Sequence, residues 1–168
     1  EIDIFEEMPP DMISLVKGNA KITVSKLAAL QGVFRMNQSQ PPFNNPKLRQ
    51  AMLRLVDQEQ AVRAYVDDKA LYTVCPSFYM CDSPYFTDAS WPKADLAAAK
   101  KLIAESGYKG EKIVVLDATE TALSPQTLVP SQRMRVAGLH VDYQAMDWGT
   151  LSSRRTSKNP VDQGGWST

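Results

Sequence analysis

The chain has 168 residues, of which 43% are hydrophobic and 23% charged, as in an ordinary globular domain. Its 19 Lys and Arg balance 19 Asp and Glu, which argues against a nucleic-acid or anionic-membrane partner, since those partners favour a basic excess. The longest strongly apolar stretch, residues 113–116, is far shorter than the roughly 20 residues of a transmembrane helix. Because the sequence starts at Glu1 and not at Met, we expect it to be a piece of a longer protein.

The pattern of the first 37 residues predicts three short strands, with one helix between the first and the second. Apolar and polar residues alternate in residues 2–6, 22–24 and 32–37, and each stretch predicts a strand. Between the first two strands, the prolines and acid of residues 9–11 begin a short helix, which Gly18 ends.

Two capping patterns mark consecutive helices in the middle of the chain. Asn45 fits an N-cap and Pro46 fits the first helical position after it. Asp57 with Gln60 three residues later forms a capping box, which predicts the start of a second helix. Residues 70–92, which hold three prolines, predict a loop.

The rest of the chain continues the alternation of helices and strands. The predicted elements are helix 95–106, strand 112–118, helix 125–137, strand 139–143, helix 147–155 and a strand beginning at residues 164–166. No linker divides the sequence, so residues 1–168 predict a single domain. The fold class that follows is α/β, with a central mixed β-sheet flanked by helices on both faces.

No catalytic or metal-binding constellation stands out. The single histidine, His140, lies between Leu139 and Val141 on a predicted strand, where a surface or edge position is a better interpretation than a catalytic one. One histidine and two separated cysteines do not form an ordinary zinc site. We therefore expect no enzyme activity, no metal and no cofactor, and keep a small α/β enzyme domain or a self-sufficient interaction module as alternatives.

The two cysteines, Cys75 and Cys81, lie in the predicted loop as VCPSFYMCDSPY. Their spacing is not that of a redox C-x-x-C motif. The residues alone leave two interpretations open: buried free thiols of a cytosolic protein, or a local disulfide of an exported one.

Two tryptophans lie at predicted element ends. Trp148 begins a helix directly after a strand, and Trp166 follows two glycines at the start of another strand. In α/β folds, ligands bind where strand ends and helix N-termini converge, so both side chains are candidates for the wall of a cleft. The alternative for each is a place in the core.

Three segments together resemble the extracellular solute-binding proteins of ABC importers, in family 5, the dipeptide-, oligopeptide- and nickel-binding type. They are FRMNQSQPPFNNPKLRQAMLRLVDQEQAV, DLAAAKKLIAESGY, and AGLHVDYQAMDWGTLSSRR followed by GGW. The resemblance covers nearly the whole chain but only part of a family member, whose two lobes close over a ligand. It implies that the chain is one lobe, domain II, with a periplasmic-binding-protein-like (type II) fold.

The resemblance also implies a function, partners and site residues. We expect a monomeric periplasmic receptor, exported by a signal peptide outside this piece of the protein. It captures a peptide-like solute between its lobes by hinge closure and delivers it to the transmembrane permease, with opine-like compounds, sugars and metal chelates as other candidate ligands. The resemblance implies a disulfide between Cys75 and Cys81. The ligand-binding residues that it implies are Thr119, Glu120, Thr121, Trp148, Trp166 and Ser167.

Overall fold

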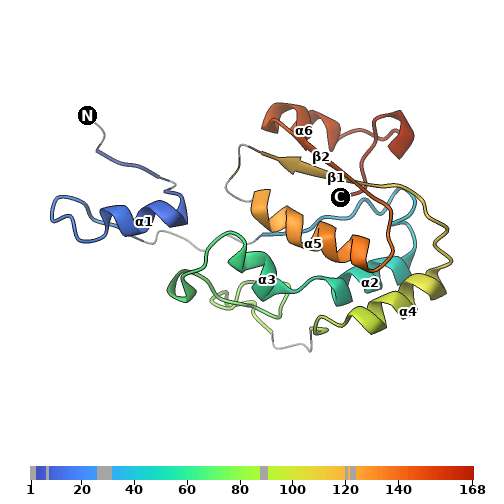
Figure 1. Ribbon diagram of the computed structural model, residues 1–168, viewed down its shortest axis with the longest axis horizontal. Coiled ribbons are helices and arrows are strands. Elements are labelled where there is room, and N and C mark those ends of the chain that lie inside the picture. The colour runs from blue at the N-terminus through green and yellow to red at the C-terminus, as the bar shows by residue number, and fades with distance from the viewer. Residues whose placement is uncertain (1–2, 7, 26–31, 88–90, 120, 122–123) are drawn as a thin grey trace.

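The computed structural model describes residues 3–6, 8–25, 32–87, 91–119, 121 and 124–168 (Figure 1). Its α-helices are α1 Pro10–Val16, α2 Pro46–Leu55, α3 Gln58–Arg63, α4 Leu96–Ser106, α5 Ser124–Val136 and α6 Trp148–Arg154. Its strands are β1 Ile113–Ala118 and β2 Val141–Met146, and two short 3-10 helices span Lys69–Leu71 and Val161–Gln163. Within these ranges, no helix combines the length and apolar character needed to cross a membrane.

The strands β1 and β2 form a parallel pair joined by the crossover helix α5. Their register runs from Ile113 opposite Val141 to Ala118 opposite Met146. All six residues of β1 are buried, whereas β2 is mostly half-buried. In Figure 1, α5 lies below the two strands and α6 above them, so helices cover both sides of the pair as the sequence predicts.

The other edge of β1 pairs with the last residues of the chain. Thr168 N donates to Val114 O at 3.1 Å and Leu116 N donates to Thr168 O at 2.8 Å, which is the hydrogen-bond pattern of parallel strands. On its far side this segment meets Asn37, whose backbone N donates to Ser167 O at 2.8 Å. Residues 166–168 therefore lie between β1 and Asn37. The strand predicted to begin at residues 164–166 is not among the strands of the structure, although this segment makes strand-like backbone bonds to β1.

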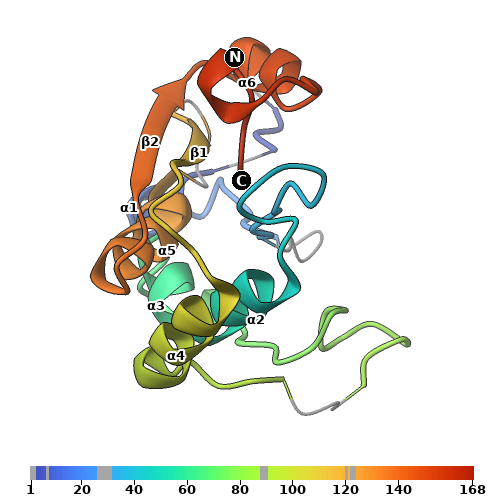
Figure 2. The same cartoon turned by 90° about the vertical axis from the view of Figure 1, so that its right-hand side faces the viewer.

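The core lies between this small sheet and the pair α2 and α4, which pack side by side (Figure 2). Leu48, Met52 and Leu55 share one face of α2 because they are four and three residues apart. They pack with other buried side chains: Phe43, Ala51, Ala99, Ile103, Ile113, Val115, Met134, Ala137 and Leu139. Burial of this cluster fixes the sheet on which the candidate site is built.

The helix starts agree with the capping patterns. Asn45 Oδ1 accepts from Lys47 N, and the carboxylates of Asp57 and Asp95 accept from Gln60 N and Ala98 N. Gly107 ends α4 with a φ of 74° in the left-handed region. Each cap is a contact between residues close in sequence, and for that reason local pattern predicts it well.

Several strand predictions are wrong. Of the stretch predicted at 2–6, residue 2 lies outside the described residues. Residues 3–6, 22–24 and 32–37 form no strand, because among the described contacts only Asn37 in these stretches bonds to the backbone of another segment. The strand predicted at 139–143 begins later, at Val141, because Leu139 N instead donates to Met134 O at the end of α5.

The N-terminal arm, residues 8–25, stands apart from the body in Figure 1. Helix α1 buries no residue, and the backbone hydrogen bonds of the described arm stay within it, as in Met12 N to Pro9 O and Lys17 N to Ile13 O. Apolar side chains on this arm are exposed, Leu15 by 77%. The arm therefore adds nothing to the core of the described chain.

Candidate functional site

The carboxyl ends of β1 and β2 bring two predicted site residues to one edge. Thr119 follows β1, and its backbone N donates to Met146 O, the last residue of β2, at 3.2 Å. Trp148 comes two residues after Met146, at the start of α6. Because the two strands are parallel, Thr119 and Trp148 both lie at the carboxyl edge, where open α/β sheets bind their ligands.

Trp148 is held by the helix that it begins. Asp147 caps α6 by accepting from Thr150 N at 2.9 Å. Hydrogen bonds from Thr150 lower the pKa of the Asp147 carboxyl, so the cap is ionised at neutral pH. The indole is 49% exposed and packs against the Arg155 guanidinium, 5.3 Å from the ring centre. Of the two interpretations of this tryptophan, a core position is therefore excluded.

The connection from β1 to α5 carries the predicted threonines. Thr121 N and Thr121 Oγ1 both donate to Ala118 O, at 3.0 and 2.9 Å, and Ser124 N donates to Thr121 O at 3.1 Å. These bonds hold Thr121 and Ser124 close to the carboxyl end of β1. Glu120, the third predicted residue of this connection, lies outside the described residues.

Trp166 and Ser167 lie elsewhere. The backbone bonds place Thr168 opposite Val115, so Trp166 lies beside the start of β1. That position is about 20 Å from Thr119 along the strand direction. Ser167 is 1% exposed, and its Oγ accepts from Val114 N at 3.0 Å. Its side chain thus contacts β1 and not the solvent.

The indole of Trp166 is half-buried, and its Nε1 is enclosed without a hydrogen-bond partner among the described residues. Its backbone O accepts from Asn37 Nδ2 at 3.1 Å. The structure therefore places Thr119, Thr121 and Trp148 at the carboxyl edge of the strand pair. Trp166 and Ser167 lie in the segment that bonds to β1 and Asn37.

Glycine is required at the two positions before Trp166 for different reasons. Gly164 adopts a φ of 83°, a left-handed conformation that side chains rarely take. Gly165 has an ordinary φ, but a Cβ there would overlap Asn159 O and lie 2.6 Å from Pro160 O. Arg154 at the end of α6 clamps this turn by donating to Gly165 O at 3.1 Å. The same guanidinium donates to Gly164 O and to Gln144 Oε1 on β2.

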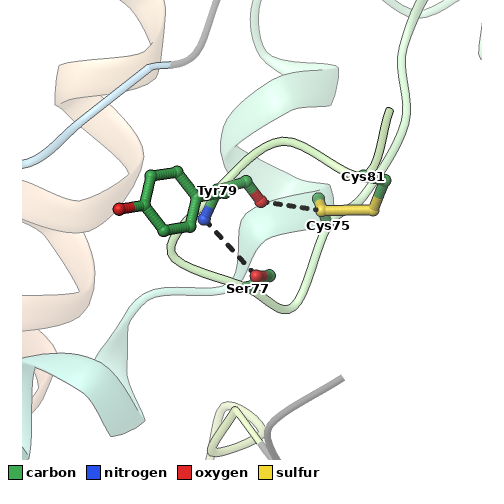
Figure 3. Close-up of a disulfide and its surroundings, with 4 residues drawn as sticks. All are labelled: Cys75, Ser77, Tyr79 and Cys81. Carbon is green, nitrogen blue, oxygen red and sulfur yellow. Dashed lines mark hydrogen bonds between the residues drawn. A yellow bond between two sulfur atoms is a disulfide. The ribbon is translucent and has the colours of Figure 1, made fainter. Parts of the chain in front are cut away.

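The disulfide between Cys75 and Cys81 is confirmed. The two Cα atoms are 5.6 Å apart, and the bond closes a short loop after the 3-10 helix Lys69–Leu71 (Figure 3). Within the loop, Tyr79 N donates to Ser77 Oγ at 3.4 Å. The rings of Tyr79 and Phe78 pack edge to face, with their centres 5.2 Å apart. The disulfide restrains this loop.

His140 is exposed and its Nδ1 lies 3.3 Å from Gly110 O. The described residues hold no group of three or more His, Cys, Asp or Glu side chains placed to bind a metal ion. A hollow of about 300 Å³, lined by Gln40, Pro41, Glu111, Lys112, Pro160, Val161 and Asp162, lies near the amino end of β1. It lies at the opposite end of the strands from Thr119 and Trp148.

The carboxyl edge also holds a buried acid that the sequence-based predictions do not include. Asp117 is 3% exposed, and Ser124 Oγ donates to its Oδ2 at 2.5 Å. The sequence carries one signal for it, an acid inside the apolar strand IVVLDA. A carboxylate in such a place needs hydrogen-bond donors, and this requirement points to nearby hydroxyls such as that of Ser124.

The family of the chain follows from comparison with known proteins. The model of the bacterial extracellular solute-binding proteins, family 5 Middle, matches residues 1–168, and the chain belongs to this family. A probable peptide ABC transporter periplasmic-binding protein, y4tO of Sinorhizobium fredii (strain NBRC 101917 / NGR234), is 37% identical over 99% of this chain and 33% of its own length. The glutathione-binding protein GsiB of Pectobacterium atrosepticum is 25% identical over 95% of this chain and 32% of its own length.

A solved structure agrees with this assignment. The ABC transporter substrate-binding protein CtaP of Listeria monocytogenes has a TM-score of 0.67 and 27% identity, over 79% of this chain and 27% of its own. The type II binding-protein fold expected from the sequence is thereby confirmed. The chain spans about a third of the length of the curated relatives that it matches.

Proposed function

We propose that this chain is one ligand-binding lobe, domain II, of a two-lobed solute-binding protein that serves an ABC import system. The observation that carries the proposal is the carboxyl edge, where the half-exposed Trp148 and Thr119 follow neighbouring parallel strands in a chain that matches the family over its whole length. The ligand bridges this lobe and another lobe of the same protein, and bridging stabilises the closed form.

The ligand is a peptide-like solute. Two observations support this class: the names of the relatives y4tO and GsiB refer to a peptide transporter and to glutathione, and the carboxyl edge offers an indole face with threonine hydroxyls. Trp148 supplies an apolar wall, and Thr119 and Thr121 supply hydrogen bonds. Trp166 and Ser167 hold the edge of the sheet, because their contacts are with Asn37 and Val114.

The protein acts in the periplasm as a monomer, and its closed form docks on the transmembrane permease. No step of this cycle changes the solute chemically. The family relation supports transport and not catalysis, since the relatives named above are transport receptors.

The first test is to purify the full-length protein gently, denature it and identify released small molecules by mass spectrometry. Each released compound, together with tri-alanine and reduced glutathione, is then added back in a thermal-shift assay. A bound peptide-like compound should raise the melting temperature increasingly as its concentration exceeds Kd. Absence of any shift with peptides would contradict the ligand class, and turnover of a bound compound would contradict the receptor function.

The second test is Trp148→Ala. Loss of the indole wall should weaken solute binding about tenfold or more, because an aromatic side chain in a binding site is often a dominant contact. Tyr85→Ala is the matched control, since Tyr85 is an exposed ring beside the disulfide loop, 69% exposed. Equal affinities for the two variants would argue against Trp148 as a ligand wall.

A further inference from the structure

Asp117 is a carboxylate enclosed in the sheet. It lies on β1, where every residue is buried, and is itself 3% exposed. Burying a carboxylate is costly unless donors compensate for the lost water. Ser124, the first residue of α5, supplies such a donor, with its Oγ 2.5 Å from Asp117 Oδ2. A short bond to a charged acceptor belongs to the stronger class of hydrogen bonds.

A third side chain completes the cluster. Tyr143 on β2 is opposite Val115, which precedes Asp117 by two residues and so lies on the same face of β1. Tyr143 therefore lies on the face of the strand pair that holds Asp117. Burial, together with the Asp117 carboxylate, raises the pKa of Tyr143 to about 12, so the phenol stays protonated at neutral pH.

The cluster is linked to the candidate ligand residues by backbone bonds. Ser124 N donates to Thr121 O at 3.1 Å, and Thr121 Oγ1 donates to Ala118 O at 2.9 Å. Ala118 in turn follows Asp117 directly on β1. Hydrogen bonds therefore connect Asp117 to Ser124, Ser124 to Thr121, and Thr121 to Ala118, the neighbour of Asp117. Together they hold Thr121 against the strand.

We infer that Asp117 is a positioning residue for ligand binding: through Ser124, and with Tyr143 beside it, it holds the start of α5 and Thr121 against the carboxyl edge of β1. The identity of Thr119 and Thr121 as ligand-facing residues rests on the proposed function. Asp117 itself does not touch the ligand, because it is enclosed and its carboxylate already serves Ser124.

Ser124 variants of the full-length protein test the inference. Ser124→Ala removes the donor, and Ser124→Thr restores a hydroxyl. Ser131→Ala is the matched control, because Ser131 is a fully buried serine of the same helix whose hydroxyl donates to Thr127 O. Tyr143→Phe removes the phenol hydroxyl, whose pKa is raised by burial and by Asp117. Asp117 itself stays unchanged in these variants, since loss of a buried charged group can prevent folding.

Hydrogen–deuterium exchange gives the first readout. In Ser124→Ala, amides of the peptide 118–126 should exchange about tenfold faster or more, the change expected for loss of a hydrogen bond to a charged group. Tyr143→Phe should act in the same direction with a smaller effect. Ser124→Thr should restore protection, and Ser131→Ala should leave this peptide unchanged. Exchange in Ser124→Ala that matches the Ser131→Ala control would overturn the inference.

Affinity for tri-alanine and reduced glutathione, measured by calorimetry where all variants are folded, gives the second readout. A probe that binds the wild type should bind Ser124→Ala at least about tenfold more weakly, with recovery in Ser124→Thr. Faster exchange with unchanged affinity would overturn the role in binding. Failure of the wild type to bind either probe would count against the proposed ligand class, while the exchange result would still decide whether Asp117 anchors this connection.

Discussion

Gly164 and Gly165 are adjacent, yet replacing each with alanine should have unequal effects. Gly164→Ala forces a side chain into a left-handed φ with nothing within 4 Å of the new Cβ, which should cost about 1 kcal/mol of unfolding free energy. Gly165→Ala places a Cβ too close to the backbone oxygens of Asn159 and Pro160. The turn must then open, which disturbs the hydrogen bonds from Arg154. We expect a loss of about 3 kcal/mol or more. Urea midpoints of the full-length protein check the order, and a larger loss for Gly164→Ala would contradict it.

Tyr143 should make stability depend on pH in the alkaline range. Its folded pKa, about 12, is above the value of about 10 for an unfolded tyrosine. The protonated phenol is therefore favoured in the folded state, and this contribution is complete below pH 10 and is lost as the pH rises toward 12. Urea midpoints at pH 9 and pH 11 should fall less in Tyr143→Phe than in the wild type. An identical fall in both proteins would refute the assignment, since Tyr72 and Tyr108 titrate equally in each.

For single residues, the sequence predicts positions better than roles. Trp148 can be proposed because an aromatic after an acidic cap lies at a strand end, and its exposure agrees with a site. Ser167 cannot be judged from the sequence, because its burial depends on Val114, which is 53 residues away. An isolated acid in an apolar strand, such as Asp117, gives no indication of its partners until the fold brings Ser124 and Tyr143 to it.

Among the elements, the joint between α2 and α4 offers a sharp test. Asn45 caps α2 through its Oδ1, and its Nδ2 donates to Ser106 O at the end of α4, at 2.8 Å. Asn45→Ala loses both bonds and should cost about 2 kcal/mol of unfolding free energy. Asn45→Asp keeps the cap but places a negative charge against the carbonyl end of α4, where helix dipoles disfavour it.

Chemical denaturation of the full-length protein gives the measurement. Asn45→Ser is the control that keeps a capping oxygen without the added charge, and it should lose less stability than Asn45→Ala. If Asn45→Asp proved as stable as the wild type, the bond to Ser106 would contribute nothing.

The sequence predicts the helices well and the strands poorly, and the reason is physical. A helix start is defined by a cap and its acceptor within three residues, as with Asp57 and Gln60. A strand exists only where a second backbone pairs with it. Residues 22–24 have the alternation of a strand but no partner among the described contacts, whereas β1 is paired on both edges.

For the whole molecule, the two-lobed proposal predicts that the 168 residues alone bind solute weakly. If the ligand bridges two lobes, removing one lobe removes about half of the contacts, and halving a micromolar binding free energy weakens affinity by more than about 100-fold. Calorimetry with the solute recovered from the full-length protein should show this difference for the isolated 168 residues. Circular dichroism and exchange protection of α2 and α4 provide the control for folding. Equal affinity of the folded fragment would contradict the two-lobed proposal.

The position of residues 166–168 also sets an order of events in folding. Residues 166–168 lie between Asn37 and β1 and bond to both. The bond from Asn37 Nδ2 to Trp166 O joins residues 129 positions apart. While the ribosome is still synthesising the chain, α2, α4 and the β1–α5–β2 unit can form, but residues 166–168, which bond to this edge of β1, emerge only afterwards. Closing so long a loop is slow because chain entropy decreases before the stabilising interactions form. The joining of Asn37 to the sheet should therefore be a late step of folding, and the packing of α2 against α4 should not depend on it.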